Sequence, residues 1–292
     1  MRMQFLAGLV GAFALAAPAH AEPDWTAVAK ALGKQGAVQQ GGVYRVALPR
    51  SDLKVKLDGV DINPGLALGS WLAFMPKGNE AMVMGDLVLT ADEVNPVMKK
   101  LLEEGIEITA VHNHLLRSQP ATMYMHIDAH GDPVKLATAL HEGLMLSRTP
   151  LGAAPAAPTQ PLGLDTSALD AALGFKGKAA GPIYQFSIPR AQPVEDDGMV
   201  VPEAMGSANG INFQATSDGK AAIAGDLVLI APEVNPVLRA LLANGIEVTA
   251  VHNHMLDDRP RLFFMHFWAH DDALKLAKGL RAALDKIAVK GS

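Results

Sequence analysis

The tetrapeptide Val111-His112-Asn113-His114 occurs a second time, letter for letter, as Val251-His252-Asn253-His254. A further pair of histidines follows each copy, and these four residues are His126, His130, His266 and His270. Eight of the ten histidines therefore occupy equivalent positions in two matching stretches of the chain. This pattern predicts a histidine-lined site in each stretch.

The match between the two stretches extends well beyond the histidines. Residues 85–89 and 225–229 both read GDLVL, and each leads into a segment containing Glu-Val-Asn-Pro-Val. A chain of 292 residues is long for one domain and about right for two. Residues 149–161 (TPLGAAPAAPTQP) have the proline-and-alanine composition of a semi-extended linker. We therefore expect two repeat domains, over residues 22–148 and 162–292.

The same order of elements is predicted in each copy. Short strands bounded by turn residues come first, and a helix follows with Asn95 as its N-cap and Pro96 at its first position. Glu93 is interpreted as a structural capping residue before this helix. Two strands over residues 106–116 and 121–130 and a last helix complete the repeat. This order predicts an α+β fold in which each repeat is an antiparallel sheet with helices on one face.

Strand alternation divides the last two strands into two unlike faces, because successive side chains point to opposite sides. The odd-numbered positions are apolar, and they include Val111, Leu115, Met123, Met125, Ile127 and Ala129. The even-numbered positions carry Ile108, Ala110, His112, His114, Tyr124, His126, Asp128 and His130. A three-residue loop, 118–120, would set His112 opposite His126, with Asp86 alongside. Two such sheets with opposed histidine faces would form a pseudo-twofold arrangement with a buried site.

Paired imidazoles on adjacent strands commonly hold Zn²⁺, Cu²⁺ or Fe²⁺, and a neighbouring carboxylate can complete the set. The candidate ligands are His112, His114, His126, His130 and Asp86 in the first repeat, and His252, His254, His266, His270 and Asp226 in the second. Zn²⁺ is the first choice, with Cu²⁺ or Fe²⁺ as alternatives. A second interpretation is that these are core histidines with backbone or carboxylate partners. The second site should be more apolar, because Phe264 and Trp268 replace Tyr124 and Asp128.

Three functions fit this pattern. The first is an exported protein that binds a transition metal for storage, delivery or sensing. The second is a metal-dependent enzyme in which some histidines bind the ion and another histidine, or Asp86, acts as general base. The third is a metal-free module that binds a small organic anion through its imidazoles. A closed four-ligand site would favour binding, whereas an open coordination position would favour catalysis.

The first 21 residues have the features of a secretory signal peptide. Arg2 supplies a positive charge, residues 5–17 are apolar, and Ala19-His20-Ala21 is a small-x-small cleavage site before Glu22. The sequence has no cysteine, so we expect no disulfide, no thiolate metal site and no lipid anchor. No later stretch approaches the roughly 20 apolar residues of a transmembrane helix. We expect a soluble periplasmic or secreted protein, whose net charge of −5 favours a metal ion or small molecule over nucleic acid as partner.

The order GDLVL, EVNPV, GIE-T-AVHNH, MH and AH, present twice, resembles a bacterial family of unknown function named for the mycobacterial lipoproteins LppY and LpqO. The resemblance covers nearly all of the chain after residue 21. It implies a location in the cell envelope and a duplicated domain, and it implies no activity. The chain departs from the lipoproteins because it lacks the cysteine to which a lipid anchor is attached.

The composition of residues 149–161 predicts that limited proteolysis of the folded protein cuts first within this segment, because exposed linkers of small residues are preferred sites of cleavage. Mass spectrometry of the earliest fragments identifies the cut. Early cleavage inside residues 101–130, with the linker intact, would show that the division into two repeats is wrong.

Overall fold

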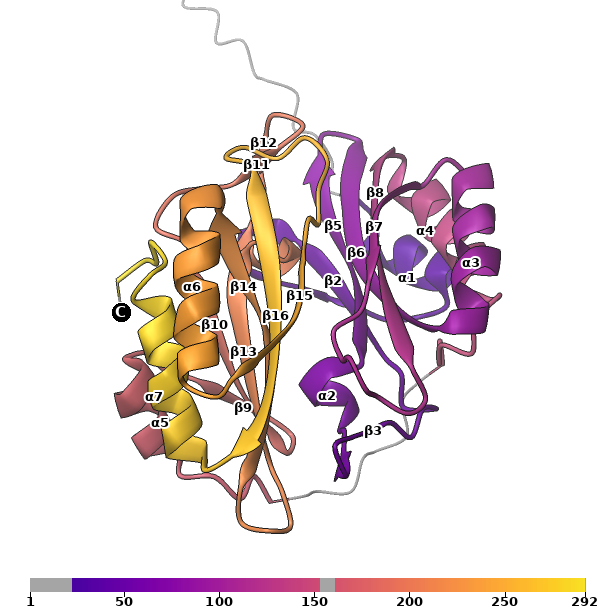
Figure 1. The fold of residues 1–292 in the computed structure, drawn as a ribbon. Helices are drawn as coiled ribbons and strands as arrows, with labels where there is room; N and C mark the ends of the chain where they lie inside the picture. The colour runs from indigo at the N-terminus through magenta and orange to yellow at the C-terminus, as the bar shows by residue number, and fades with distance from the viewer. Residues whose placement is uncertain (1–22, 153–160, 292) are drawn as a thin grey trace, which may run out of the picture.

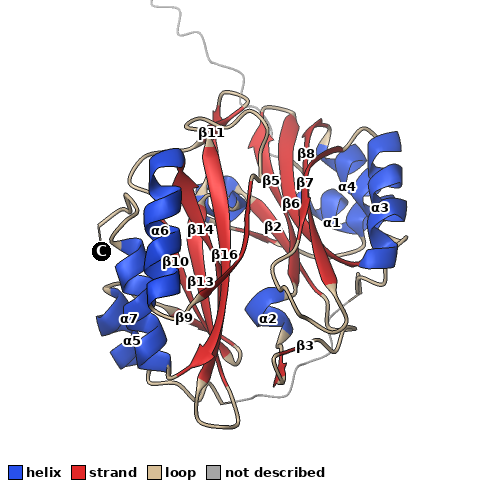
Figure 2. Ribbon diagram, viewed as in Figure 1, coloured by secondary structure: helices blue, strands red, loops and turns tan. Residues whose placement is uncertain are grey.

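The computed structural model describes residues 23–152 and 161–291, which form two similar halves, each a six-stranded antiparallel sheet with helices on its outer face (Figure 1). The inner faces of the two sheets are turned toward each other (Figure 2). The predicted α+β fold with two tandem repeats is confirmed. The predicted signal peptide, residues 1–21, and residues 153–160 of the predicted linker lie outside the described residues.

The first half has the strand order β1-β2-β5-β6-β8-β7. These strands are β1 (Ala37–Val38), β2 (Tyr44–Pro49), β5 (Gly69–Lys77), β6 (Glu80–Thr90), β8 (Thr122–Gly131) and β7 (Glu107–His112). Its outer helices are α1 (Trp25–Leu32), α3 (Ala91–Glu103) and α4 (Pro133–Leu144). A 3-10 turn lies at Gln40–Gly42, and an arm between β2 and β5 carries β3 (Lys56–Leu57), β4 (Val60–Asp61) and the short helix α2 (Pro64–Ala67).

The second half repeats this arrangement with the strand order β9-β10-β13-β14-β16-β15. These strands are β9 (Lys178–Ala180), β10 (Ile183–Pro189), β13 (Ala208–Ala215), β14 (Ala221–Ile230), β16 (Leu262–Asp271) and β15 (Glu247–His252). Its outer helices are α5 (Thr166–Leu173), α6 (Ala231–Ala243) and α7 (Ala273–Leu284). The matching arm carries β11 (Glu195–Asp196), β12 (Met199–Val200) and the 3-10 turn Glu203–Met205.

An apolar core fills the space between each sheet and its outer helices. In the first half, Met125, Ile127 and Ala129 of β8 lie in this core together with Leu101 of α3 and Leu140 of α4. These three strand residues occupy odd-numbered positions, so their predicted face is confirmed. The second half has an equivalent core. The inner faces are therefore left for contacts between the halves.

Two arms hold the halves together across their inner faces. The first arm, residues 53–68, shares an apolar cluster with Trp268 of the second half. The second arm, residues 194–206, shares another with Met82 of the first half. Each arm thus packs against the sheet of the opposite half, and the exchange produces the pseudo-twofold arrangement. The folding of each half on its own stays a prediction.

The connection between β7 and β8 is longer than the predicted three-residue loop. β7 ends at His112 and β8 begins at Thr122. Within this connection, Gln119 pairs through its backbone with Lys56 of the first arm, and both N···O distances are 2.9 Å. This pairing with the arm holds the connection away from a tight turn.

The register between β7 and β8 also differs from the prediction. A β-bulge between Ile108 and Ala110 inserts an extra residue into β7. As a result, His112 lies opposite Tyr124, and Ala110 takes the place opposite His126. The face predicted for the histidines is unaffected, because a shift of two positions preserves alternation. Two other predictions are wrong: Ile108, before the bulge, packs against the outer core, and Leu115, beyond the end of β7, lies in the inner apolar cluster.

Helix α3 begins earlier than predicted. It starts at Ala91, and Pro96 lies inside the helix rather than at its first position. The Glu93 carboxylate accepts a hydrogen bond at 2.9 Å from the backbone N–H of Thr90. This cap stabilises the first turn, which offsets the hydrogen bond that proline cannot donate.

A buried ion pair connects helix α3 to the first sheet, and an equivalent pair connects helix α6 to the second. Arg50 has no exposed surface and donates to Glu93 at 2.8 and 3.2 Å and to the carbonyl of Val88 at 2.7 Å. Burial opposes ionisation of Glu93, but hydrogen bonds from Arg50 and from the backbone outweigh it and lower the pKa of this carboxyl. Arg190 and Glu233 form the equivalent pair in the second half. The structural role predicted for Glu93 is confirmed.

Substitution Glu233→Ala leaves the Arg190 guanidinium buried without its carboxylate, so we expect the free energy of unfolding to fall by about 3–5 kcal/mol. Glu93→Ala should cost less, because Arg50 keeps a second carboxylate, Asp52, at 2.9 Å. Urea denaturation followed by circular dichroism measures both.

The control for this comparison is Glu103→Ala, whose ion pair with Lys99 is exposed and contributes less than about 1 kcal/mol. Equal losses in Glu233→Ala and Glu103→Ala would contradict the role assigned to the buried pair.

Candidate functional site

The middle of each sheet places an aspartate beside a histidine. Asp86 on β6 lies directly opposite His126 on β8, and Asp226 on β14 lies directly opposite His266 on β16. Directly opposed residues of antiparallel strands point to the same face, and here that face is the inner one. The predicted position of Asp86 alongside the histidines is confirmed.

Six imidazoles meet between the two sheets, and they belong to His112, His114, His126, His252, His254 and His266. The closest contacts join one half to the other. Ring centroids lie 3.5 Å apart for His112 and His252, 3.6 Å for His114 and His266, and 3.7 Å for His126 and His254. The two sites expected, one in each repeat, are thus one cluster to which both halves contribute. The face-to-face packing of the sheets, which sequence spacing does not report, brings them together.

The orientation of the rings leaves the Nε2 atoms of the cluster free for a ligand. The Nδ1 atoms of His112, His252 and His266 lie 3.4, 2.8 and 3.0 Å from backbone carbonyl oxygens. An Nδ1–H that donates to a carbonyl leaves Nε2 deprotonated, with its lone pair available. All six Nε2 atoms are buried and lack a hydrogen-bond partner within the described part of the chain. Buried polar atoms rarely lack a partner, so this donor set fits a bound ion.

The two carboxylates stand close to the same imidazoles. An oxygen of Asp86 lies 3.8 Å from Nε2 of His114, and the other oxygen lies 3.9 Å from Nε2 of His126. Asp226 lies 3.5 Å from Nε2 of His254. These separations are too long for good hydrogen bonds. Two ligands that each lie about 2.1 Å from one ion in tetrahedral geometry are about 3.4 Å apart, so the spacing suits shared coordination.

Two groups of residues bring their ligand atoms within 4.8 Å of one another. One group consists of His112, His252, His254 and His266, and the other consists of Asp86, His112 and His126. Four histidines can form a closed tetrahedral set, whereas three ligands leave a position for water or substrate. Both groups contain His112, which makes this residue the centre of the cluster.

Burial holds the cluster in its uncharged state. It raises the pKa of Asp86 to about 8, although the positive charge of Arg45 opposes the shift. It lowers the pKa of His112 to about 3 and that of His252 to about 4. Neutral imidazole is the form that binds a metal. These histidines are therefore ready to act as ligands across the neutral pH range.

His130 and His270 do not join the cluster. Each lies on the same strand as a cluster histidine but four residues further along, which corresponds to about 13 Å. Nε2 of His130 lies 3.2 Å from Asp197, and Nε2 of His270 lies 3.0 Å from the hydroxyl of Thr216. Alternation assigned both residues to the correct face but did not report their distance from the centre.

An aromatic ring stacks on the cluster from each half. The ring of Tyr124 lies 3.5 Å from that of His114, and the ring of Phe264 lies 3.4 Å from that of His254. The Tyr124 hydroxyl donates to the carbonyl of Ala67 at 2.7 Å, outside the group of ligand atoms. The replacement of Tyr124 by Phe264 therefore changes no polar group among the ligand atoms of the shared cluster.

A cavity of about 1170 Å³ connects the cluster with the surface between the sheets. Its inner end is lined by Asp86, His114, His126, Asp226, His254 and His266. Its walls include Arg45 and Trp71, which the sequence analysis did not single out. The sequence does contain one indication that Arg45 is special, because the second copy has Gln185 at the corresponding position.

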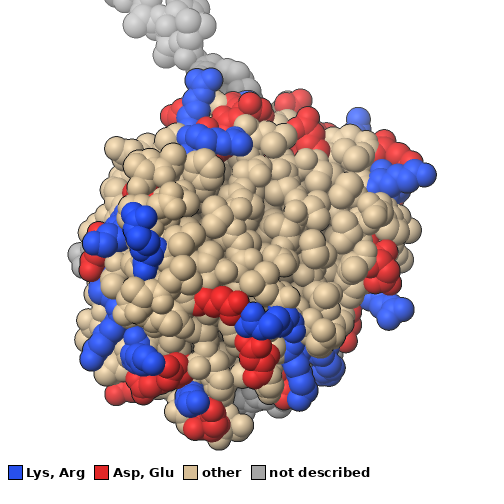
Figure 3. All heavy atoms as spheres, in the orientation of Figure 1, with Lys and Arg blue, Asp and Glu red and all other residues tan. Residues whose placement is uncertain are grey.

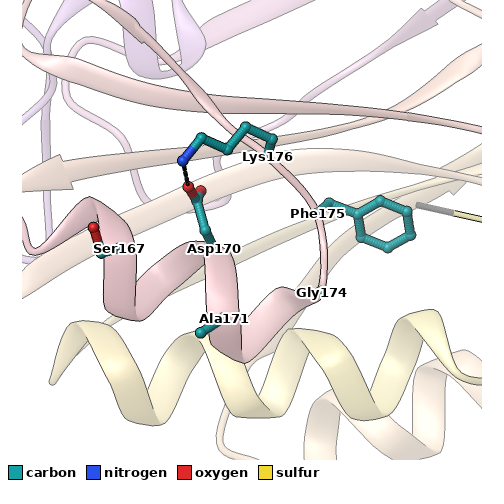
Figure 4. A pocket seen from close by; sticks show the side chains of 6 residues that line it. All are labelled: Ser167, Asp170, Ala171, Gly174, Phe175 and Lys176. Carbon is teal, nitrogen blue, oxygen red and sulfur yellow. Dashed lines mark ion pairs between the residues drawn. The ribbon is translucent and has the colours of Figure 1, made fainter.

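A smaller hollow of about 400 Å³ lies on the outer surface at α5 (Figure 4). Asp170 in this hollow pairs with Lys176 at 2.8 Å, and it accepts hydrogen bonds from the Tyr184 hydroxyl at 2.7 Å and the Gly177 N–H at 3.0 Å. These contacts connect α5 to the strands that follow it. The residues that line the hollow therefore have a structural role.

The surface carries charges of both signs. Figure 3 shows Lys and Arg interspersed with Asp and Glu around the margins of one face, and few charged side chains at its centre. Among the described residues, no helix has both the length and the apolar character needed to cross a membrane.

Comparison with known proteins finds the duplication again. The family described as Domain of Unknown Function (DUF1259) matches residues 26–146 and 167–286. No curated protein sequence matches the chain. Two solved structures are weakly similar: the trimeric bacterial microcompartment shell protein PduB (12% identity, TM-score 0.21, 87% of this chain and 91% of that chain covered) and EtuB from Clostridium kluyveri (8% identity, TM-score 0.20, 87% and 90% covered). Similarity at this level does not indicate a function.

The stability of the metal-free protein should pass through a maximum near pH 6.5, the ordinary pKa of histidine. Below this pH, the unfolded chain takes up protons on histidines that stay neutral in the folded cluster. The six histidines bind more protons in this range than the unfolded carboxylates release, so the folded state loses stability as the pH falls. From pH 6.5 to about 8, the folded state keeps a proton on Asp86 that the unfolded chain has lost, so stability falls as the pH rises.

Urea denaturation of metal-stripped protein from pH 4 to 9 measures this profile. The double variant Asp86→Asn/Asp226→Asn should reduce the decline above pH 6.5 and retain the decline at acid pH; part of the alkaline decline remains, because burial and the neighbouring Asp196 also raise the pKa of Asp128 to about 8. Asp257→Asn, on an exposed loop, is the control. An unchanged alkaline decline in the double variant would contradict the assignment.

Proposed function

The chain belongs to the family described as Domain of Unknown Function (DUF1259), and we propose that this member binds one divalent transition-metal ion in the histidine cluster between its halves. The observation that carries the proposal is the set of six buried Nε2 atoms that lack hydrogen-bond partners in the described residues. Each buried polar atom left unpaired costs about 1–3 kcal/mol. An ion bonded to several of these atoms offsets that cost.

The donor atoms limit the choice of metal. The cluster offers imidazole nitrogens and carboxylate oxygens, and the sequence has no cysteine to supply thiolate. Such sets suit Zn²⁺ first, with Cu²⁺ or Fe²⁺ as alternatives. The proposed ligands are His112, His252, His254 and His266, with Asp86 and Asp226 placed to orient or complete the set. A closed four-histidine site favours metal storage, delivery or sensing over catalysis.

The cavity supports a second candidate, a metal-dependent enzyme. It reaches Asp86 and His126, which with His112 form the three-ligand group. An ion in this group would keep an open position toward the cavity. Asp86, whose pKa burial raises to about 8, would be placed to exchange a proton with a bound molecule near neutral pH.

We also infer export to the periplasm or the medium. The inference rests on the signal-peptide pattern of residues 1–21 and on the resemblance to the LppY and LpqO lipoproteins.

Protein purified without an affinity tag should bind about one Zn²⁺ per chain in calorimetric titration after metal removal. His112→Ala should weaken binding by more than about 100-fold, because loss of a group that merely orients a ligand already costs about 10–100-fold. His252→Ala should have the same effect although it lies in the other half. His130→Ala, outside the cluster, is the control.

The comparison of these variants decides between one shared site and two separate ones. If His112→Ala and His252→Ala each remove half of two bound ions, the shared site is wrong. If Zn²⁺, Cu²⁺ and Fe²⁺ all bind wild-type protein more weakly than about 10 μM, equivalent to about 7 kcal/mol, the metal proposal fails and a metal-free module for a small ligand replaces it.

A further inference from the structure

The cavity that ends at the cluster has unequal walls. At about 1170 Å³ it is slightly larger than the roughly 300–1,000 Å³ of a usual small-molecule site. On the first sheet, Trp71 lies directly opposite Asp86 in the strand register. On the second sheet, Gly210 lies directly opposite Asp226. The same position relative to the central aspartate thus carries the largest side chain in one half and none in the other.

The glycine keeps the cavity open. A Cβ atom added at Gly210 would have no heavy atom within 4 Å, whereas one added at Gly206 would lie 3.2 Å from the ring of Trp71. The Trp71 ring is therefore packed against the second arm. The space beside Gly210 stays available to a bound molecule, directly next to Asp226.

Arg45 provides a cationic group on the wall of the cavity. Its guanidinium lies 4.2 Å from the centre of the Trp71 ring, and among the described residues its hydrogen bond goes to the carbonyl of Ala204. Stacking on an aromatic ring holds the guanidinium plane and leaves its remaining N–H groups in a fixed arrangement. Burial lowers the pKa of Arg45 only to about 10, so it stays charged at neutral pH.

Among the described residues, no carboxylate hydrogen-bonds to Arg45, and the opposite charge that acts on it is that of Asp86 in the cluster. Asp86 and Asp226 face the imidazoles of the cluster, and a divalent ion held there would neutralise any charge on these carboxylates; this step rests on the proposed function. The other charged wall residues are Arg190, which pairs with Glu233, and Glu203 and Lys290, which have opposite charges. One positive charge remains, that of Arg45. A carboxylate accepts two parallel N–H groups from one guanidinium.

We propose that the cavity binds a small organic carboxylate, with its carboxylate group paired with Arg45 and the rest of the molecule extending past Gly210 toward the ion. The second repeat has Gln185 where the first has Arg45, so the chain carries one such site. Arg45 recognises the ligand, and Gly210 sets the space for it.

Calorimetric titration of the Zn²⁺-loaded full chain with acetate, butyrate and benzoate tests the proposal. At least one should bind more tightly than about 1 mM. Arg45→Gln, which copies the second repeat, and Gly210→Trp, which copies the first, should each weaken that binding by at least about 10-fold. Arg45→Lys should retain part of it, because it keeps the charge and loses the paired N–H groups. Arg239→Gln, on the exposed surface of α6, is the charge-matched control.

Elemental analysis of each variant separates this proposal from the metal site, since Arg45 and Gly210 lie outside both ligand groups and metal content should be unchanged. Equal binding by wild type and Arg45→Gln would overturn the proposal, as would tighter binding of methyl benzoate or of inorganic phosphate than of every carboxylate. If stripped protein binds the carboxylate as tightly as loaded protein, contact with the ion is overturned. Absence of Zn²⁺ binding in the same preparation would refute the proposed function itself.

Discussion

Each sheet of this protein has two faces to bury, and its own half supplies helices for only one of them. The inner face carries a central aspartate and three histidines, and among the described residues it is covered by the sheet of the other half and by both arms. Desolvation of the imidazoles is therefore a consequence of the duplication. The lowered pKa of His112, the raised pKa of Asp86 and the unpaired Nε2 atoms all follow from this one packing arrangement.

A hydrogen bond between the halves also supports this packing of the two sheets. The side-chain amide of Asn253 donates to the carbonyl of Thr109 in the other half at 2.9 Å. The carbonyl of Asn253 faces Nδ1 of His252 at 2.8 Å. One asparagine thus connects the two halves and selects the tautomer that leaves Nε2 of a central histidine free. In the second copy of the VHNH motif, the residue between the histidines thus takes part both in the site and in the contact between the halves.

Alternation along a strand is a local property, and it was enough to predict the outer face of β8, the face of the histidines and the place of Asp86. It assigned Ile108 and Leu115 to the wrong faces, because a bulge interrupts β7 and the strand ends at His112. The position of His112 opposite Tyr124 was not predictable, because it depends on a bulge and on backbone pairing of Gln119 with an arm more than fifty residues away in sequence. Periodicity likewise could not distinguish His126 from His130, because residues four apart on a strand share a face whatever their distance from the centre. The merging of two sites into one depends on how the halves pack, and no spacing within a repeat contains that information.

The positions at which the two repeats differ can be understood from their distance to the pseudo-twofold axis that relates the halves. His112 contacts His252, its own counterpart, so both copies of this position share one contact and neither can change without altering the surroundings of the other. Trp71 packs against Gly206 of the second arm, whereas Gly210, at the corresponding position, faces open space. Away from the axis, each side chain meets a different environment, and the two copies are free to diverge. The histidine cluster is symmetrical and the cavity that leads to it is not, so the chain has a single site that a ligand approaches from one direction. Two independent domains of the same sequence would not provide such a site.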